Sequence, residues 1–437
     1  MNIRRVAENY EKLCASNGFK SSKFWDVVVL TAIDEQQKIY YESFLEARKR
    51  NYLLPFHSFC TYMVVVDPSI STNNRIGSGG VTFCALASVK VELQKKGYRG
   101  DVFSKVKVLM IHSAGYSLTN PNLAATGTIF SPLSSFIFPG LTIPTLFDFK
   151  MAQYAPIAEK CSPGLMVMSG DVFGVFDPFV DCFSFVQEGC FAVGHLDDYK
   201  YAANQGVFVV ENDEFEYDKK LSCKQYCYKF KYNELNNVGG RIPGVVSEDE
   251  NLYILDSDYF LSANIVMKLI CYYESSPEAL SKGEEIDCYG DFMSCFKGVD
   301  SPEISNRIKN CESEALKNIR MSLWSILKEE NLFVVVPKRH TLCRIRTMTE
   351  YSKHLSMGMK ELLHGDIEEN ETNGKRVIAS NLKGDCSIGQ SAILSSTLQN
   401  TRIGDGSVIE FSSVVGKALT HLNNVQLPNI GLYKNYV

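Results

Sequence analysis

Short apolar runs alternate with amphipathic stretches over the first part of this chain. Four runs have the length and apolar content of buried strands, at residues 25–32, 61–67, 106–112 and 164–171. The first is followed by Asp34, a favoured N-cap residue, and by a polar stretch that ends in basic residues at 48–50, as helices do. A second helix is predicted over 81–97, with Gly97 at its end. Continuous apolar strands separated by helices predict a parallel α/β sheet, covered on both faces, whose ligands bind at the carboxyl ends of the strands.

Beyond Asp171 the apolar runs become shorter. Strands are predicted over 191–195 and 206–211, and the residues from 211 to 237 are polar and rich in Lys and Tyr. Insertions of that kind often contact a substrate. Two further core-facing helices are predicted where apolar residues recur at helical spacing, over 261–275 and 313–330.

The tail of the chain has a different pattern. The polar segment DIEENETNGK, residues 366–375, has no apolar spacing and is predicted to be a linker. After it, apolar positions recur six residues apart in two sets, Leu382, Ile388 and Leu394, then Ile403, Ile409 and Val415. A glycine follows three of these positions, at Gly389, Gly404 and Gly416. This period predicts the stacked coils of a β-helix, and ordinary short strands are the alternative.

These patterns divide the chain into three parts. An N-terminal helix is expected within residues 1–24, a Rossmann-like α/β domain over 25–365 and a short β-helix domain over 376–437. The 437 residues allow two or three domains of ordinary size, and 45% hydrophobic with 22% charged residues is typical of globular proteins. The net charge of -5 excludes the basic footprint of a nucleic-acid-binding protein, so an anionic ligand must be held by local groups.

The N-terminal stretch MNIRRVAENYEKLCASNGFK lacks the apolar core of a signal peptide, and no apolar run approaches the roughly 18 residues of a membrane span. We therefore expect a cytoplasmic protein without a membrane partner. Its 14 cysteines are then predicted to be reduced thiols, mostly buried. There is no C-x-x-C pair, and Cys223 with Cys227 lacks the second ligand pair of a zinc site.

A glycine-rich turn precedes the predicted helix at 81–97. In IGSGGVTFCAL, Gly77, Gly79 and Gly80 stand where backbone amides can approach phosphate oxygens at a helix N-terminus. The turn matches neither the P-loop nor the Rossmann fingerprint. The alternative is a tight turn that only requires positive φ.

A second loop of small residues follows the third strand. The segment IHSAGYS brings Gly115 and Ser117 to the carboxyl end of that strand, where they would flank the same pocket. His112 lies in this segment too, and a structural histidine with its hydrogen bonds satisfied is the simpler reading of a lone His.

Carboxylates stand at two places that suit a metal. Asp171 ends the fourth strand, where one carboxylate can hold Mg²⁺ while phosphates supply other oxygens. The segment EEIDCYGDF offers Glu285, Asp287 and Asp291 as candidates for a second metal carboxylate. A capping aspartate and a solvated acidic loop are the respective alternatives.

The blocks FWDVVVLTA, GSGGVTFCAL, IHSAGYS, GLMVMSGD, QGVFVV, LDSDY and EIDCYGDF occur in an order that resembles the fucose-1-phosphate guanylyltransferase (GDP-L-fucose pyrophosphorylase) family. The resemblance runs from about residue 24 to 351 and, with the tail, nearly to the end. It implies a sugar-nucleotidyltransferase α/β fold with a mixed sheet, followed by a left-handed β-helix.

The resemblance also implies a reaction. An oxygen of L-fucose-1-phosphate would attack the α-phosphorus of GTP and release pyrophosphate, with Mg²⁺ required and charge stabilisation as the main task. By position, Gly77, Gly79 and Gly80 would line the GTP, with Gly115 and Ser117 in the second nucleotide loop. Asp171 would hold the metal. Asp287 and Asp291 would lie near the sugar phosphate or the metal.

Three positions depart from the family pattern. Thr119 stands where an Arg is expected, Thr128 where a Lys is expected, and Arg346 where the family has Gly. A cation that faces the transferring phosphoryl group can contribute on the order of 10³-fold or more in rate. The two threonines therefore bear directly on catalysis.

Two hypotheses follow. In the first, the chain is an active guanylyltransferase in which Lys105, Lys150 or a basic residue of 219–231 covers the phosphates. In the second, it is a pseudoenzyme that keeps the fold as a nucleotide-sugar or partner-binding protein. A Lys or Arg within reach of the pocket between Gly79 and Asp171 favours the first. A third reading, an acyltransferase with a hexapeptide tail, leaves the large α/β part unexplained. The sugar phosphate, the base and the oligomeric state stay open.

Overall fold

The structure is a computed structural model of the whole chain. It describes residues 3–15, 24–55, 59–68, 75–115, 117, 119–120, 123–124, 126–133, 143–185, 187–210, 215–229, 252–277, 284–296, 302–356, 376–378, 380–389, 391–404, 407–410, 412–415 and 426–428. The predicted linker at 366–375 and Gly416 lie outside these residues. Among the described helices, none is long and apolar enough to cross a membrane.

One nine-stranded sheet organises the α/β part, in the order β2-β1-β3-β4-β9-β6-β10-β8-β7. Its first half is parallel and consists of β2 (Thr61–Val66), β1 (Val27–Ala32), β3 (Lys107–His112) and β4 (Gly164–Ser169). These are the four strands that the apolar runs predict.

The second half of the sheet is mainly antiparallel. It consists of β9 (Tyr253–Ser262), β6 (Cys190–Asp197), β10 (Leu332–Val335), β8 (Lys220–Tyr228) and β7 (Gly206–Val210). Strand β9 runs antiparallel to both β4 and β6, and only β6 and β10 pair in parallel. The expectation of a parallel sheet is therefore correct for the first half alone. The segment between β7 and β8 is too short for the dozen or more residues that a parallel crossover requires, so these two strands pair antiparallel.

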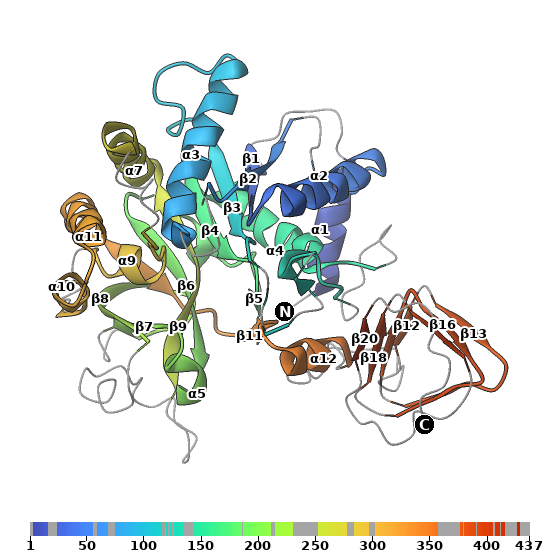
Figure 1. Cartoon of the computed structure of the whole chain (residues 1–437). Helices are drawn as coiled ribbons and strands as arrows, with labels where there is room; N and C mark the ends of the chain where they lie inside the picture. The colour runs from blue at the N-terminus through green and yellow to red at the C-terminus, as the bar shows by residue number, and fades with distance from the viewer. Residues whose placement is uncertain are drawn as a thin grey trace.

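Helices cover both faces of the sheet, as predicted (Figure 1). Val28 and Leu30 of β1 face one buried cluster, whereas Val27 and Val29 face the other. The first face carries α1 (Ile3–Ala15), α2 (Glu35–Arg50) and α4 (Leu146–Lys160). The second carries α3 (Gly77–Lys95), α7 (Ala263–Ser275), α9 (Gly290–Met293), α10 (Pro302–Lys309) and α11 (Glu314–Leu327).

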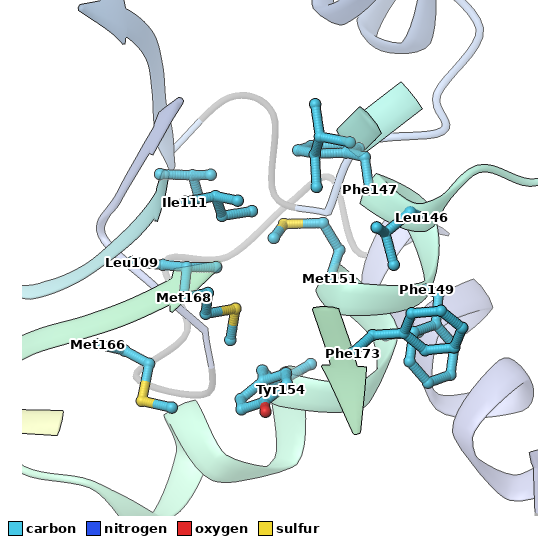
Figure 2. Packing of buried hydrophobic residues seen from close by; sticks show 14 of the residues in the cluster. Leu109, Ile111, Leu146, Phe147, Phe149, Met151, Tyr154, Met166, Met168 and Phe173 are labelled. Carbon is cyan, nitrogen blue, oxygen red and sulfur yellow. The ribbon is translucent and has the colours of Figure 1, made fainter. Parts of the chain in front are cut away.

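Helix α4 has no counterpart among the predicted elements. Every residue from Leu146 to Ala158 is buried, so the helix has no polar face that would give an amphipathic period. Figure 2 shows Met151 and Tyr154 of α4 lying against Leu109 and Met168 of β3 and β4. The short elements near this layer are η2 (Thr128–Phe130) and η3 (Asp181–Phe183), whereas α5 (Tyr199–Ala202) packs against β7 and β9.

A two-stranded ribbon leaves the carboxyl end of β4. Strand β5 (Val172–Phe176) pairs antiparallel with β11 (His340–Arg344), which leads into α12 (Met348–Ser356). The ribbon places residues 344–346 next to the end of β4, although the two segments are far apart in the sequence.

The tail forms three parallel ladders. The first ladder consists of β12 (Arg376–Ile378), β15 (Ala392–Leu394), β18 (Val408–Glu410) and β20 (Gln426–Pro428). The second consists of β13 (Asn381–Lys383), β16 (Thr397–Gln399) and β19 (Ser413–Val415). The third pairs β14 (Ser387–Ile388) with β17 (Arg402–Ile403). Stacked parallel coils are therefore present, as predicted.

The six-residue apolar period is wrong in detail. The interior of the coils is formed by apolar residues that follow one another at a spacing of five or six residues: Ile388, Ile393, Leu398, Ile403, Ile409 and Val414. Leu382 and Val415 are instead 41% and 46% exposed. Leu394 is buried, but it packs into the cluster of the α/β part. The coils therefore point one set of aliphatic side chains into their own interior. A second set of apolar side chains packs the coils against the α/β part, next to α12 (Figure 1).

Candidate active site

The glycine-rich turn at the start of α3 packs against residues 284–288. Gly77 has a φ of +71°, and a Cβ there would lie 2.4 Å from the carbonyl oxygen of Ile286. A Cβ on Gly79 would lie 2.6 Å from the Ile286 side chain, and the Gly79 amide donates to the Ile286 carbonyl at 2.8 Å. Gly80 is similarly close to Ile76. The structure therefore shows a close backbone approach that requires glycine at this turn, which is the alternative given above. A role of these glycines in phosphate binding stays a prediction.

His112 is a partly buried histidine whose ring nitrogens contact other side chains of the protein. Its Nε2 lies 3.0 Å from Thr82 Oγ1 and its Nδ1 lies 3.3 Å from Cys288 Sγ, so both ring nitrogens have partners. Burial lowers the pKa of His112 to about 4, against the opposing charge of Asp287, and keeps the ring neutral at pH 7. His112 thus joins β3, α3 and the segment at 284–288.

The second small-residue loop lies at the end of β3, as predicted. Gly115 has a φ of +149°, and no atom of the described residues lies within 4 Å of the position that a Cβ would take there; Ser117 has a φ of +42°. Thr119, which follows in this loop, donates its hydroxyl to the backbone carbonyl of Arg346. Thr128 begins η2, after Gly127, where an added Cβ would clash with the Tyr41 hydroxyl.

Asp171 lies at the end of β4 and forms an ion pair with Arg346. One carboxylate oxygen, Oδ1, accepts from the Ser169 hydroxyl, and the other, Oδ2, lies 3.0 Å from Arg346 Nε. The ribbon of β5 and β11 sets this contact, because Ile345 N donates to Asp171 O at 2.8 Å. Both side chains are 37% exposed. Burial lowers the pKa of Arg346, but the charge and hydrogen bond of Asp171, together with the charges of Asp256 and Glu350, outweigh it and raise that pKa above its usual value.

A small polar cavity opens beside this pair. Its volume is about 60 Å³, which is the share of about two water molecules in the liquid. Its polar lining includes Ser169, Gln205, Tyr228, Asp256, Tyr289 and Arg346. The Tyr289 hydroxyl is buried and has no hydrogen-bond partner among the described residues. The cavity therefore presents an unused donor and a guanidinium at the carboxyl edge of β4.

Strand β9 contributes two buried carboxylates, Asp256 in the lining of the cavity and Asp258 two residues further along. Asp256 accepts from the Tyr226 hydroxyl at 2.6 Å and from Gly206 N at 3.1 Å, and burial raises its pKa to about 6. Asp258 accepts from the Tyr154 hydroxyl and lies 4.0 Å from Lys150 Nζ. Burial of Lys150 lowers the pKa of that amine, which has no hydrogen-bond partner among the described residues.

Sequence reasoning missed the two β9 carboxylates as site residues. The block LDSDY carries the signal, because Asp256 and Asp258 are two buried aspartates within an otherwise apolar strand. The register of β9 shifts between Asp256 and Tyr259, so the two side chains meet different partners. Buried aspartates are costly unless they are paired.

The acidic segment at 285–291 has mainly a structural role. Asp291 is fully buried, its Oδ1 lies 2.9 Å from Arg307 Nε and 2.8 Å from Arg320 Nε, and its Oδ2 accepts from Asp287 N at 2.9 Å. Both oxygens of Asp291 thus have partners within the protein, and its place near the sugar phosphate or the metal stays a prediction. Asp287 accepts from Tyr289 N at 2.9 Å and from the Tyr228 hydroxyl, which lines the cavity. Glu285 is exposed.

The cations proposed for the phosphates lie in different places. Lys105 is exposed and donates to Arg99 O at 2.9 Å, away from the cavity. Lys150 is buried next to Asp258 and does not line the cavity. Within residues 219–231, Lys229 stacks 4.7 Å above the Tyr228 ring, whereas 230 and 231 lie outside the described residues. Arg346, a departure from the family pattern, is the cation that lines the cavity.

The described residues do not fit a resident Mg²⁺. They contain no group of three or more His, Cys, Asp or Glu side chains that could hold a metal ion. The predicted ligand Asp171 has one oxygen paired with Ser169 and the other with Arg346.

Fold and site together define an α/β protein with a polar site at the carboxyl edge of its parallel strands and a tail of stacked parallel coils. The chain belongs to the fucose pyrophosphorylase domain family, whose model matches residues 100–430. It is 27% identical to fucose-1-phosphate guanylyltransferase of Mus musculus over 95% of this chain and 72% of that protein. For the Homo sapiens protein of the same name, identity is 27% over 95% of this chain and 70% of that protein. A crystal structure of HddC from Yersinia pseudotuberculosis gives a TM-score of 0.31 at 10% identity, over 76% of this chain and 97% of HddC, which is too low to establish a common fold.

Proposed function

We propose that this protein transfers a guanylyl group from GTP to L-fucose-1-phosphate, giving GDP-L-fucose and pyrophosphate. Family membership and the names of the mouse and human relatives support nucleotidyl transfer in nucleotide-sugar metabolism. The observation that carries the proposal is Arg346, whose guanidinium lines the cavity beside Asp171. A cation thus lies at the pocket although Thr119 and Thr128 replace the two expected there.

In this reaction the protein mainly has to position the two substrates and to stabilise negative charge on the phosphoryl oxygens. An oxygen of the sugar phosphate attacks the α-phosphorus in line, and negative charge spreads over the phosphoryl oxygens. Arg346 can pair with these oxygens, and the Tyr289 hydroxyl can donate one hydrogen bond. Gly115 and Ser117 lie in the loop at the same edge, where no described atom comes within 4 Å of a Cβ placed on Gly115. The roles of Gly77, Gly79 and Gly80 at the nucleotide and the need for Mg²⁺ are part of the proposal.

A second candidate function is nucleotide-sugar binding without catalysis. It is favoured by the ion pair itself, because both oxygens of Asp171 already have partners. In this case the fold would bind a nucleotide sugar or another partner and release no pyrophosphate.

One assay separates the two functions. Pyrophosphate release is measured with GTP, Mg²⁺ and fucose-1-phosphate, next to reactions with ATP or UTP and with other sugar-1-phosphates. Release that requires fucose-1-phosphate and is fastest with GTP supports the transferase. Binding of GTP or GDP-L-fucose by calorimetry, without release above background, would establish the binding protein instead.

We also propose that the three ladders of the tail wind as a left-handed β-helix and that the protein is cytoplasmic. The parallel register of the ladders supports the first point. All 14 cysteines are free, as expected for a reducing compartment.

A further inference from the structure

The short helix α12 joins the cavity to the coils of the tail. Arg346, whose guanidinium lines the cavity, stands two residues before this helix. Its backbone N–H donates to Glu350 Oε2 at 3.0 Å, and its carbonyl accepts from the Thr119 hydroxyl. Glu350 also accepts from Thr347 N at 3.0 Å, and its own amide donates to Thr347 Oγ1 at 3.2 Å, which together form a capping box. The backbone of Arg346 is therefore fixed to the first turn of α12.

Tyr351, the residue after Glu350, fixes this turn to the tail. Its side chain is buried, and its hydroxyl donates to Glu410 Oε1 at 2.6 Å. Glu410 is the last residue of β18, and the preceding Ile409 belongs to the interior of the coils. Because side chains alternate along a strand, Glu410 faces out of the coils, toward α12. A series of contacts thus runs from the third coil strand of the first ladder to the backbone of Arg346.

The hydrogen bond between Tyr351 and Glu410 adds direction to an apolar contact. Val408 of β18 lies in the same buried cluster as Tyr351 and Leu355 of α12, but apolar burial by itself is non-directional. A hydrogen bond requires its two oxygen atoms to lie within about 3 Å of each other. Without the Tyr351 hydroxyl, the buried carboxyl of Glu410 would lack its described partner, which is unfavourable. The bond therefore favours one position of α12 on the coils.

We propose that the tail positions Arg346 at the cavity, through the hydrogen bond between Tyr351 and Glu410 and the first turn of α12. Tyr351 and Glu410 are then positioning residues that act through Arg346, since neither is among the described residues that line the cavity. The role of this placement in pyrophosphate release rests on the proposed function, whereas the placement itself does not. The coils would thus contribute to the site without contacting a substrate.

The placement is tested by nuclear magnetic resonance on the full chain with isotope-labelled arginine. The Nε–H signal of Arg346 is assigned by its absence in Arg346→Lys, and its proton is held by Asp171 Oδ2, which lies 3.0 Å from Nε. We expect Tyr351→Phe to increase the rate at which this proton exchanges with water at least about fivefold. Glu410→Gln keeps an acceptor oxygen for the Tyr351 hydroxyl and should restrain the proton as the natural protein does.

Tyr62→Phe is the matched control. It also removes one tyrosine hydroxyl, which donates to Pro55 O at 2.8 Å, but on the edge strand β2. The exchange rate of the Arg346 proton should not change in this variant. An unchanged rate in Tyr351→Phe would overturn the proposal, and so would an equal increase in Tyr62→Phe, because the effect would then be general destabilisation.

Kinetics test whether the placement serves the reaction. Tyr351→Phe should lower kcat/KM for pyrophosphate release about fivefold in the natural protein, and should cause no further loss once Arg346 is replaced by alanine. An equal loss in both backgrounds would show that Tyr351 does not act through Arg346, and the proposal would fail. If the natural protein releases no pyrophosphate, the proposed function fails, while faster proton exchange in Tyr351→Phe alone would still support the placement of Arg346 by the tail.

Discussion

Asp171 and Asp291 both form ion pairs with arginine, but in opposite environments. Asp291 is fully buried between Arg307 and Arg320 and joins α9 to α10 and α11. Asp171 is 37% exposed and meets Arg346 at the rim of a cavity. A buried pair cannot lose one partner without leaving an uncompensated charge, whereas an exposed pair is screened by water. Residue type alone therefore does not distinguish an aspartate that holds the fold from one that can exchange ligands.

The largest expected effect is on stability, at Asp291. Asp291→Ala leaves two arginines without their shared counter-ion and should lower the free energy of unfolding by about 3 to 5 kcal/mol. Urea denaturation followed by circular dichroism measures this loss. A stable variant that has lost only pyrophosphate release would instead place Asp291 in the catalytic site.

Glu410 extends the comparison to a buried carboxylate whose described partner is not a cation. It accepts from the Tyr351 hydroxyl at 2.6 Å, where α12 meets the coils. Burial raises the pKa of Glu410 to about 7, against the opposing effect of that hydrogen bond. Because the folded protein holds this proton more tightly than the unfolded chain, the contribution to stability is complete below about pH 4.5 and is lost as the pH rises through 7.

Glu410→Gln should therefore stabilise the protein at high pH. At pH 8 the expected gain over the natural protein is on the order of 3 kcal/mol, and it should shrink toward zero near pH 4.5. Unfolding free energies of both proteins across this range provide the measurement. A difference that does not change with pH would show that Glu410 does not titrate in the folded state.

Arg346 should affect the reaction far more than stability. Arg346→Ala is expected to change the free energy of unfolding by less than about 1 kcal/mol, because the pair is half-exposed. Loss of a cation that faces developing phosphoryl charge should lower kcat/KM for pyrophosphate release by about a hundredfold. Arg50→Ala, which removes an exposed arginine elsewhere, is the control.

A second substitution, at Thr119, should restore part of the activity that Arg346→Ala loses. Its hydroxyl contacts the backbone of Arg346, so an arginine at 119 begins next to the place that Arg346 vacates. Thr119→Arg combined with Arg346→Ala should recover part of the lost rate. If Arg346→Ala is as active as the natural protein, Arg346 does not serve the phosphates and another cation must.

The contrast between the two aspartates also explains what sequence reasoning could reach. The four parallel strands, helices α2 and α3 and the stacked coils follow local apolar patterns, and these were predicted. Asp171 and Asp291 could not be told apart, because Arg307 and Arg320 are 16 and 29 residues from Asp291 and Arg346 is 175 residues from Asp171. Such pairings are set by how the strands meet. Helix α4 was missed for a local reason, since burial on all sides removes its period.

The smallest expected effect is at Tyr289, whose hydroxyl is buried at the cavity without a described partner. Tyr289→Phe removes only this oxygen, and because no described group loses a bond, stability should stay within about 0.5 kcal/mol or rise slightly. If the hydroxyl donates to a phosphate or sugar oxygen, KM for one substrate should increase about fivefold, the loss of roughly 1 kcal/mol, with little change in kcat. Initial rates at varied GTP and varied fucose-1-phosphate identify which substrate is affected. Unchanged KM values for both would mean that the hydroxyl faces no ligand, and the cavity would then be a packing feature behind the Asp171–Arg346 pair.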